Sequence, residues 1–233
     1  MDEARRLSAN LPFGAVIAEA QSAGRGRLPG RTWTSKSGQA LLATAWLPRS
    51  AWPAPNQPPV ALIAGLAVAK ACLAWAESES GTFRQGIAIK WPNDLLCGPR
   101  KLAGILCETN DSTIYIGMGV NCSQDAFSGE YRTEPTSILM ETGQAPDRSR
   151  LLALILDELH TLVSRHDDWL MELDHLLAWK GKKVEFRQGL ATGQPHRGTL
   201  LGLGEDGGLL LETGDTTYHF HSGELSLVID EYS

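Results

Sequence analysis

The chain reads KLAGILCETNDSTIYIGMGV from residue 101 to residue 120, and this stretch forms the centre of the predicted fold. Two apolar runs, residues 102–107 and 113–120, flank an Asn-Asp-Ser sequence that is typical of a turn. Apolar runs joined by such a turn predict a β-hairpin. Gly117 and Gly119 alternate along the second run, so one face of that strand has no side chains at these positions. Either tight packing or a bound ligand would explain such a bare surface.

Regular elements are predicted on both sides of this hairpin. Apolar periodicity predicts helices over residues 2–9, 60–79, 151–166 and 168–178, and strands over residues 13–20, 40–47 and 87–91. Residues 123–150 are polar and are expected to be mostly irregular. Five short strands with Gly-rich turns follow, over residues 183–187, 198–203, 208–212, 217–221 and 225–229. The pattern indicates an α+β region, residues 1–179, and a small β domain of barrel type, residues 180–233.

Composition limits the classes of function. The 233 residues carry a formal net charge of −6, which weighs against broad nucleic-acid binding, since that usually needs a basic face. The N-terminus lacks the apolar segment of a signal peptide. The longest apolar run, residues 60–76, is interrupted by Lys70 and predicts a buried helix rather than a membrane span.

Cysteine usage indicates the compartment in which the protein is found. The four cysteines form no C-x-x-C pair, and at least three lie inside apolar segments; they are Cys72, Cys97, Cys107 and Cys122. Reduced core thiols in a cytoplasmic protein are therefore expected.

A basic segment stands out against this acidic background. Residues 24–33 read GRGRLPGRTW, and the predicted loop over residues 21–33 directly follows a predicted strand. Arginine offers planar forks that match carboxylate and phosphate oxygens, and Trp33 offers a flat face for stacking. The loop is typical of one that folds over an anionic compound carrying a flat ring. A solvated loop whose arginines pair with nearby carboxylates is the alternative.

Two further motifs carry polar groups at strand ends. Residues 90–94 read KWPND, which places the amide of Asn93 and the carboxylate of Asp94 where metal and phosphate contacts often occur, although a turn cap would use the same residues. Lys101 leads into a strand that holds the small residue Gly104. His219 and His221 share a strand face, but two ligands without a nearby cysteine are too few for a structural zinc site, so no metal is expected there.

Taken together and in this order, the motifs resemble those of the biotin protein ligase family. The series is GRGR with GRTW, then KWPND, then KLAGIL, then GMGVN, and residues 222–227 resemble the end of that family's C-terminal domain. The resemblance runs through almost the whole chain. It implies a mixed β-sheet backed by helices, related to class II synthetases, followed by a small SH3-like barrel. It is similar to the monofunctional type, because no helix-turn-helix region precedes these motifs.

The resemblance implies a two-step reaction that uses ATP, biotin and Mg²⁺. The biotin carboxylate attacks the α-phosphate of ATP to give biotinyl-5′-AMP and pyrophosphate. The amine of one lysine on a biotin carboxyl carrier domain then attacks the anhydride and releases AMP. The catalytic residues implied are Lys101, which bridges the biotin carboxylate and the α-phosphate, together with Asp94 and Arg27. Asp94 would also organise Mg²⁺.

The same resemblance implies two overlapping sets of binding residues. Those for biotin are Gln21, Gly24, Arg25, Arg27, Lys101 and Gly104. Those for ATP and the adenylate are Arg25, Arg27, Arg31, Trp33, Asn93, Lys101 and Asn121.

The sequence departs from the family pattern in two places. Ser-Thr-Asn usually precedes the first helix, and Met1 stands where that motif should end. Either the start of the chain lies upstream or biotin binding is weakened. The loop also has one extra residue at Leu28-Pro29, which changes the expected placement of Trp33. Two alternatives therefore stay open: a lipoate or octanoyl ligase, and a truncated biotin or adenylate binder. The sequence also leaves open whether an exposed strand pairs with the carrier protein or with a second copy of the chain.

Overall fold

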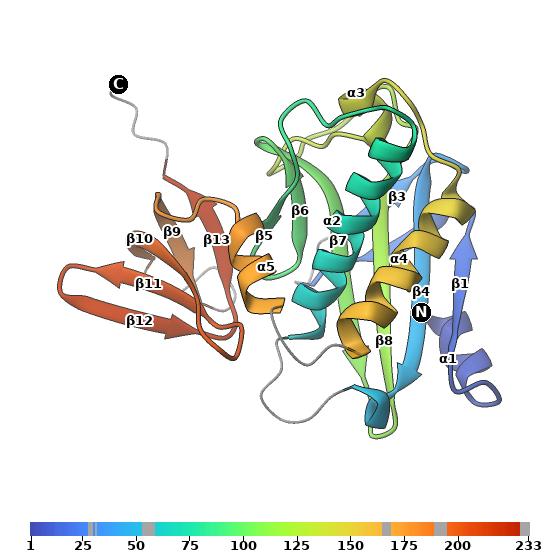
Figure 1. Cartoon of the computed structure of the whole chain (residues 1–233), viewed down its shortest axis with the longest axis horizontal. Coiled ribbons are helices and arrows are strands. Elements are labelled where there is room, and N and C mark those ends of the chain that lie inside the picture. Colours follow the sequence, from blue (N-terminus) through green and yellow to red (C-terminus); the bar gives the residue numbers. More distant parts are fainter. Residues whose placement is uncertain (28–29, 31, 53–58, 165–168, 189–194, 229–233) are drawn as a thin grey trace.

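A six-stranded sheet forms the centre of the molecule (Figure 1). The computed structural model describes residues 1–27, 30, 32–52, 59–164, 169–188 and 195–228. In order across the sheet, the strands are β1 (Gly14–Ala18), β4 (Ala40–Pro48), β8 (Thr113–Asn121), β7 (Arg100–Thr109), β6 (Asp94–Cys97) and β5 (Ala88–Lys90). The predicted hairpin is the β7–β8 pair at the middle of this sheet.

The pairing of these strands differs from the mixed sheet that was expected. Every pair of neighbours in the six-stranded sheet is antiparallel. Among the described residues, parallel pairing is limited to two isolated bridges, Ile89 with Leu177 and Lys101 with Pro135. Strands β5, β6, β7 and β8 follow one another in the chain and pair through short connections, whereas β4 and β8 pair although residues 49–112 separate them in the sequence.

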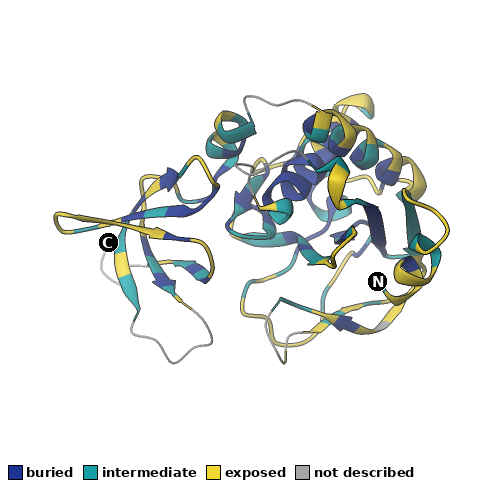
Figure 2. Cartoon of the chain, turned by 90° about the horizontal axis from the view of Figure 1, so that it is seen from below, coloured by how far each residue is buried: buried dark blue, intermediate teal, exposed yellow. Residues whose placement is uncertain are grey.

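Two long helices cover one face of the sheet. Helix α2 (Val60–Ser78) packs against β7 and against α4 (Arg148–Ser164). Although α2 is long and apolar enough to cross a membrane by composition, 67% of its apolar window is buried inside the protein, as expected of a core helix. Its Lys70 reaches the surface of this layer, where its Nζ lies 2.7 Å from Glu172 Oε2. Figure 2 shows buried residues gathered between the helices and the strands.

The opposite face carries smaller elements. Helix α1 (Asp2–Ser8) packs its Ala4 against Trp46 of β4 and Tyr115 of β8. The expected loop over residues 21–33 instead contains a two-stranded hairpin of β2 (Gln21–Arg25) and β3 (Thr32–Ser35), while Leu28, Pro29 and Arg31 lie outside the described residues.

The second sheet contains all five strands predicted near the C-terminus. In order they are β12 (Thr216–Phe220), β11 (Leu209–Thr213), β10 (His196–Leu203), β9 (Lys183–Arg187) and β13 (Glu224–Leu227), all antiparallel to their neighbours. Strands β12 and β13 form its edges, so the sheet is not closed into a barrel in the part of the chain that is described. Its core joins that of the first sheet, since the rings of Phe186 and Trp91 lie 6.1 Å apart between centroids.

Three further short helices lie within the described residues. They are the 3₁₀ helix η1 (Arg49–Ala51), α3 (Ile138–Thr142) and α5 (Trp169–Leu176). Helix α3 lies in the segment that was expected to be mostly irregular. The Ser137 hydroxyl caps it by accepting a hydrogen bond from the Met140 amide, and Gly143 ends it in the left-handed region. Such a short helix has too little apolar periodicity to be recognised from sequence.

Candidate active site

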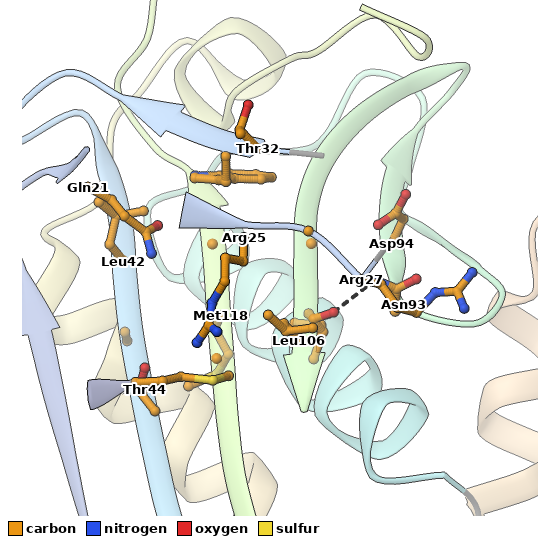
Figure 3. A pocket seen from close by; sticks show the side chains of 18 of the residues that line it. Gln21, Arg25, Arg27, Thr32, Leu42, Thr44, Asn93, Asp94, Leu106 and Met118 are labelled. Atoms are coloured by element: carbon orange, nitrogen blue, oxygen red, sulfur yellow. Dashed lines mark hydrogen bonds between the residues drawn. The ribbon is translucent and has the colours of Figure 1, made fainter. Parts of the chain in front are cut away.

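A pocket of about 320 Å³ lies between the sheet and the β2–β3 hairpin. Its floor is the sheet face opposite α2, formed by short stretches of β4, β7 and β8, namely residues 42–44, 104–106 and 117–119. Gln21, Leu42 and Thr44 lie on one side of this pocket and Asn93 with Asp94 on the other (Figure 3). The pocket therefore extends across most of the sheet's width.

Glycines form the middle of the floor. Gly104 of β7 and Gly119 of β8 are direct partners in the sheet, and both line the pocket. A Cβ at Gly119 would lie 2.8 Å from Cε2 of Trp33, and a Cβ at Gly104 would lie 3.4 Å from Cζ3 of the same ring. The indole of Trp33 therefore lies on this glycine surface. Because the floor has no side chains at these positions, it can hold a flat ring in direct contact with the backbone.

A lysine and a carboxylate meet at the edge of this floor. Lys101 Nζ donates a hydrogen bond to Asp94 Oδ1 at 2.7 Å, and both residues line the pocket. The β6–β7 pairing brings them together, since Asp94 is the register partner of Gly104. Lys101 Nζ also lies 5.7 Å from the centroid of the Trp33 ring. Cation, carboxylate and aromatic ring thus surround one point above the glycines.

The KWPND turn is tied to the neighbouring strand. Asn93 donates from Nδ2 to the Ile105 carbonyl at 2.8 Å, and the Ile105 amide donates to the Asn93 carbonyl at the same distance. Lys90, which was not among the predicted site residues, also lines the pocket, and its Nζ lies 5.5 Å from the centroid of the Trp179 ring. Burial lowers the pKa of the Lys90 amine. Its place at the head of the KWPND motif was the available sequence signal.

The arginines of the hairpin extend over the pocket in two directions. Arg25 lies 3.4 Å from Glu108 through its Nη2 atom and remains largely exposed. Arg27 reaches the other way and donates from Nη2 to the carbonyl of Gly223 at 2.5 Å. Glu224 and Leu225, at the start of β13, also line the pocket. The second sheet therefore contributes one wall, which no sequence motif indicated.

Not every predicted site residue lies at the pocket. Asn121 is 5% exposed and does not line it, because its Nδ2 donates to Thr136 O at 2.9 Å and its Oδ1 accepts from Gln124 at 3.0 Å. Gly24 is also absent from the lining. A Cβ there would lie 2.2 Å from the Trp33 carbonyl oxygen, so this glycine permits the close pairing of β2 and β3. Arg31 lies outside the described residues.

Thr44 and Met1 are further lining residues that were not among the predicted site residues. Thr44 is a polar side chain on the floor, and it pairs across the sheet with Gly117. Its position opposite a glycine of the GMG motif was the signal that identifies it. Met1 also lines the pocket, and a Cβ at Gly117 would lie 2.6 Å from Met1 Cε. The residue at which the family's Ser-Thr-Asn motif was expected to end therefore lies at the pocket floor.

Comparisons with known proteins agree with this geometry. A biotin–[acetyl-CoA-carboxylase] ligase of Paracoccus denitrificans is 31% identical over 227 residues, which cover 90% of this chain and 88% of that protein. The biotin protein ligase of Aquifex aeolicus in complex with biotin and ATP superposes with a TM-score of 0.79 at 28% identity, over 97% of this chain and 94% of that one. The biotin protein ligase of Leishmania major in complex with biotinyl-5-AMP superposes with a TM-score of 0.68 at 26% identity, over 95% of this chain and 94% of that one.

A family model matches the part of the chain that builds most of the pocket. The match covers residues 3–125, which include the hairpin, the KWPND turn and both glycine-bearing strands. More than half of the chain is therefore matched, and the chain belongs to the biotin/lipoate A/B protein ligase family.

Proposed function

We propose that the chain is an ATP-dependent biotin protein ligase that forms biotinyl-5′-AMP and transfers biotin to a lysine of a biotin carboxyl carrier domain. The observation that carries this proposal is the Lys101–Asp94 pair beside the floor of Gly104 and Gly119. A cation at the edge of a flat, side-chain-free surface suits a ligand with a ring and a carboxylate. The relatives whose structures contain biotin with ATP or biotinyl-5-AMP support the same conclusion.

The first step brings two anionic reactants together. A carboxylate oxygen of biotin attacks the α-phosphorus of ATP, the bond to the bridging oxygen breaks, and pyrophosphate leaves. Lys101 bridges the carboxylate and the α-phosphate, while Arg25 and Arg27 hold further oxygens and reduce repulsion. Gln21 contacts biotin at the far end of the pocket, and Trp33 covers the adenylate. Closure of the hairpin over the labile anhydride keeps water away from it.

The polar groups of the KWPND turn also fit Mg²⁺. Asp94 uses Oδ1 for Lys101, and its other oxygen carries no hydrogen bond from the described residues. Asn93 donates with its amide nitrogen, which leaves its side-chain oxygen available as an acceptor. Carboxylate and amide oxygens beside phosphates are the usual surroundings of Mg²⁺. The ion bound there would neutralise part of the charge on the ATP phosphates.

The second step needs a neutral amine close to the anhydride. The ε-amine of the carrier lysine attacks the acyl carbon, the bond to the phosphate oxygen breaks, and AMP leaves as the amine loses a proton. Asp94 lies at the pocket edge near Lys101 and is placed to orient this amine. The carrier domain is the protein partner in this scheme. An exposed sheet edge would receive either this domain or a second copy of the chain.

The proposal includes the arrangement of the whole chain. The region up to Trp179 acts as the catalytic domain, residues 1–179, with a sheet related to that of class II synthetases. The region of residues 180–233 acts as a small SH3-like domain whose Glu224 and Leu225 face the pocket. The reduced thiols expected of the chain's four cysteines favour a cytoplasmic enzyme, and the acidic net charge of −6 weighs against nucleic-acid binding.

The experiment replaces the bridging cation. We expect Lys101→Ala to lower biotin-dependent pyrophosphate exchange into ATP by at least about 100-fold, the loss typical of removing one group that stabilises developing charge. The control is Lys36→Ala, at an exposed lysine outside the pocket. Circular dichroism should show the same fold in both variants. Near-normal exchange by a folded Lys101→Ala protein would overturn the proposal.

The same assay distinguishes the lipoate or octanoyl ligase. The unmodified protein is offered a biotin carrier domain with biotin, and separately a lipoyl domain with lipoate or octanoate. We expect ATP-dependent transfer only to the biotin carrier. Transfer only to the lipoyl domain would assign the other branch of the family, and binding of biotin without transfer would assign the non-catalytic binder.

A further inference from the structure

A cluster of possible metal ligands lies on the second sheet. Asp206 belongs to the turn between β10 and β11, whereas His219 lies on β12 and His221 follows it directly. Because they are two residues apart on an extended segment, the two imidazoles lie on one face, with ring centroids 4.5 Å apart. His219 Nε2 lies 2.9 Å from Asp206 Oδ1, and His221 Nδ1 lies 3.5 Å from Asp206 Oδ2.

The turn is shaped to admit one of these imidazoles. A Cβ at Gly208 would lie 2.2 Å from His219 Nε2, and a Cβ at Gly204 would lie 2.9 Å from the same atom. Two glycines therefore leave the space that His219 occupies. The Gly208 amide donates to Asp206 Oδ1 at 2.9 Å, which orients the carboxylate toward the histidines.

We propose that Asp206, His219 and His221 bind one divalent transition-metal ion, of which Zn²⁺ is the representative. The three candidate ligand atoms lie within 4.8 Å of one another, so small side-chain rotations bring all of them to one ion. Imidazole nitrogen with a carboxylate oxygen suits Zn²⁺ and its neighbours, whereas Mg²⁺ and Ca²⁺ prefer oxygen ligands alone. Three protein ligands at an exposed position leave at least one place for water.

The site is coupled to the catalytic turn through one backbone group. The Gly207 carbonyl accepts a hydrogen bond from Trp91 Nε1 at 3.1 Å, and Trp91 stands between Lys90 and Asn93 in the KWPND turn. The metal ligand Asp206 directly precedes Gly207. A metal ion that joins Asp206 to β12 therefore restrains the residues that contact the catalytic turn. We expect it to raise the thermal stability of the protein.

The sequence alone does not indicate this site, because only the His219–His221 pair is visible as a local pattern. The third ligand, Asp206, lies 13 residues before His219 and is brought close by the β10–β11 turn and the pairing of β11 with β12. No short sequence motif shows such a juxtaposition. The cysteines are not needed as ligands, since Cys72, Cys97 and Cys122 are buried.

Cobalt titration of the whole chain tests the proposal. The protein is freed of metal, kept in millimolar Mg²⁺, and titrated with Co²⁺, whose visible absorption reports its ligands; Zn²⁺ is then added to displace it. We expect one equivalent of Co²⁺ without a thiolate charge-transfer band. His219→Ala and His221→Ala should each weaken Co²⁺ binding by at least about tenfold. Losing a residue that only hydrogen-bonds a metal ligand already costs about this much, and losing the ligand itself should cost no less. Asp206→Asn should weaken Co²⁺ binding as well.

The control is His160→Ala, at an exposed histidine of α4, which should bind like the parent. Circular dichroism checks that each variant is folded, and Zn²⁺ should raise the Tm of the parent and of His160→Ala only. No binding by the parent, or undiminished binding by a folded His219→Ala, His221→Ala double variant, would overturn the proposal.

Discussion

The two faces of the central sheet use the same strands for different purposes. On the face toward α2, β8 presents Ile116, which is fully buried, and β7 presents Ile105, which is 2% exposed. On the other face the same strands present Gly117, Gly119 and Gly104 to the pocket. Since side chains alternate along a strand, one sequence encodes both faces.

The difference teaches where stability and ligand binding reside. The helix face removes large aliphatic side chains from water, which is the main stabilising term of the fold. The glycines of the pocket face bury no side chains and contribute little to this term. Charged residues line the pocket instead, including Lys90, Asp94 and Lys101. Mutations on the two faces should therefore separate: one class lowers the free energy of unfolding, and the other lowers affinity for substrates.

The largest effect is expected on the helix face. Ile116→Ala removes three buried carbons at a site with no exposed surface, and it leaves a cavity. We expect a loss of about 2–5 kcal/mol in the free energy of unfolding, which corresponds to a fall in Tm of roughly 5–15 °C. Urea denaturation measures it. Calorimetry with biotin on the folded variant should give nearly the parent affinity, and a large loss of affinity would break the comparison.

The next effect is expected on the pocket face. Gly119→Val places a Cβ 2.8 Å from the present position of Cε2 of Trp33, and its methyl groups take up floor space. We expect biotin affinity to fall about 100-fold, or roughly 3 kcal/mol, because the ligand loses direct contact with the backbone. The unfolding free energy should change little, since the exposed β2–β3 hairpin can move away from the sheet. Calorimetry and urea denaturation measure the two quantities on the same sample.

A buried glycine of the helix face provides the matched control. Gly65 lies on α2, and a Cβ there would meet Leu95 Cδ1 at 3.7 Å, an ordinary contact distance. Gly65→Ala should leave biotin affinity unchanged and raise stability by up to about 1 kcal/mol, the helix propensity difference. If Gly65→Ala weakened biotin binding as much as Gly119→Val, the two faces would not be functionally separate.

Sequence patterns predicted most of the regular elements. The hairpin of β7 and β8, the apolar helix α2 and the five strands of the second sheet are all present where periodicity placed them. Lys101 and Asp94, which were both predicted as site residues, form an ion pair at the edge of the pocket, and their catalytic roles stay predictions. These features depend on local periodicity or on motifs next to strand ends, and both involve residues that are close together in the sequence.

Features that depend on contacts between distant segments were not predictable. Asn121 fits a binding motif, yet its amide is used by Thr136 and Gln124. The sequence predicts a loop over residues 21–33 because its glycines have low β-propensity, and only the pairing of β2 with β3 makes the described part of this segment regular. Glu224 reaches the pocket through the packing of the second sheet, which no local pattern reports.

The smallest effect concerns the charge that the pocket face keeps. Burial lowers the pKa of Lys90 from its ordinary value of 10.5, so its charged form is less favourable in the folded protein than in the unfolded chain. Lys90→Met should therefore raise the Tm by about 2 °C at pH 7 while reducing ligase activity. As the pH rises through the lowered pKa, Lys90 of the parent becomes neutral in the folded protein and no longer destabilises it. The difference in Tm between Lys90→Met and the parent should therefore be smaller at about pH 10 than at pH 7. Lys36→Met, at an exposed lysine, should change the Tm at neither pH. A gain that was equal at both pH values would show that the methionine stabilises by packing, and that charge on the pocket face does not oppose stability.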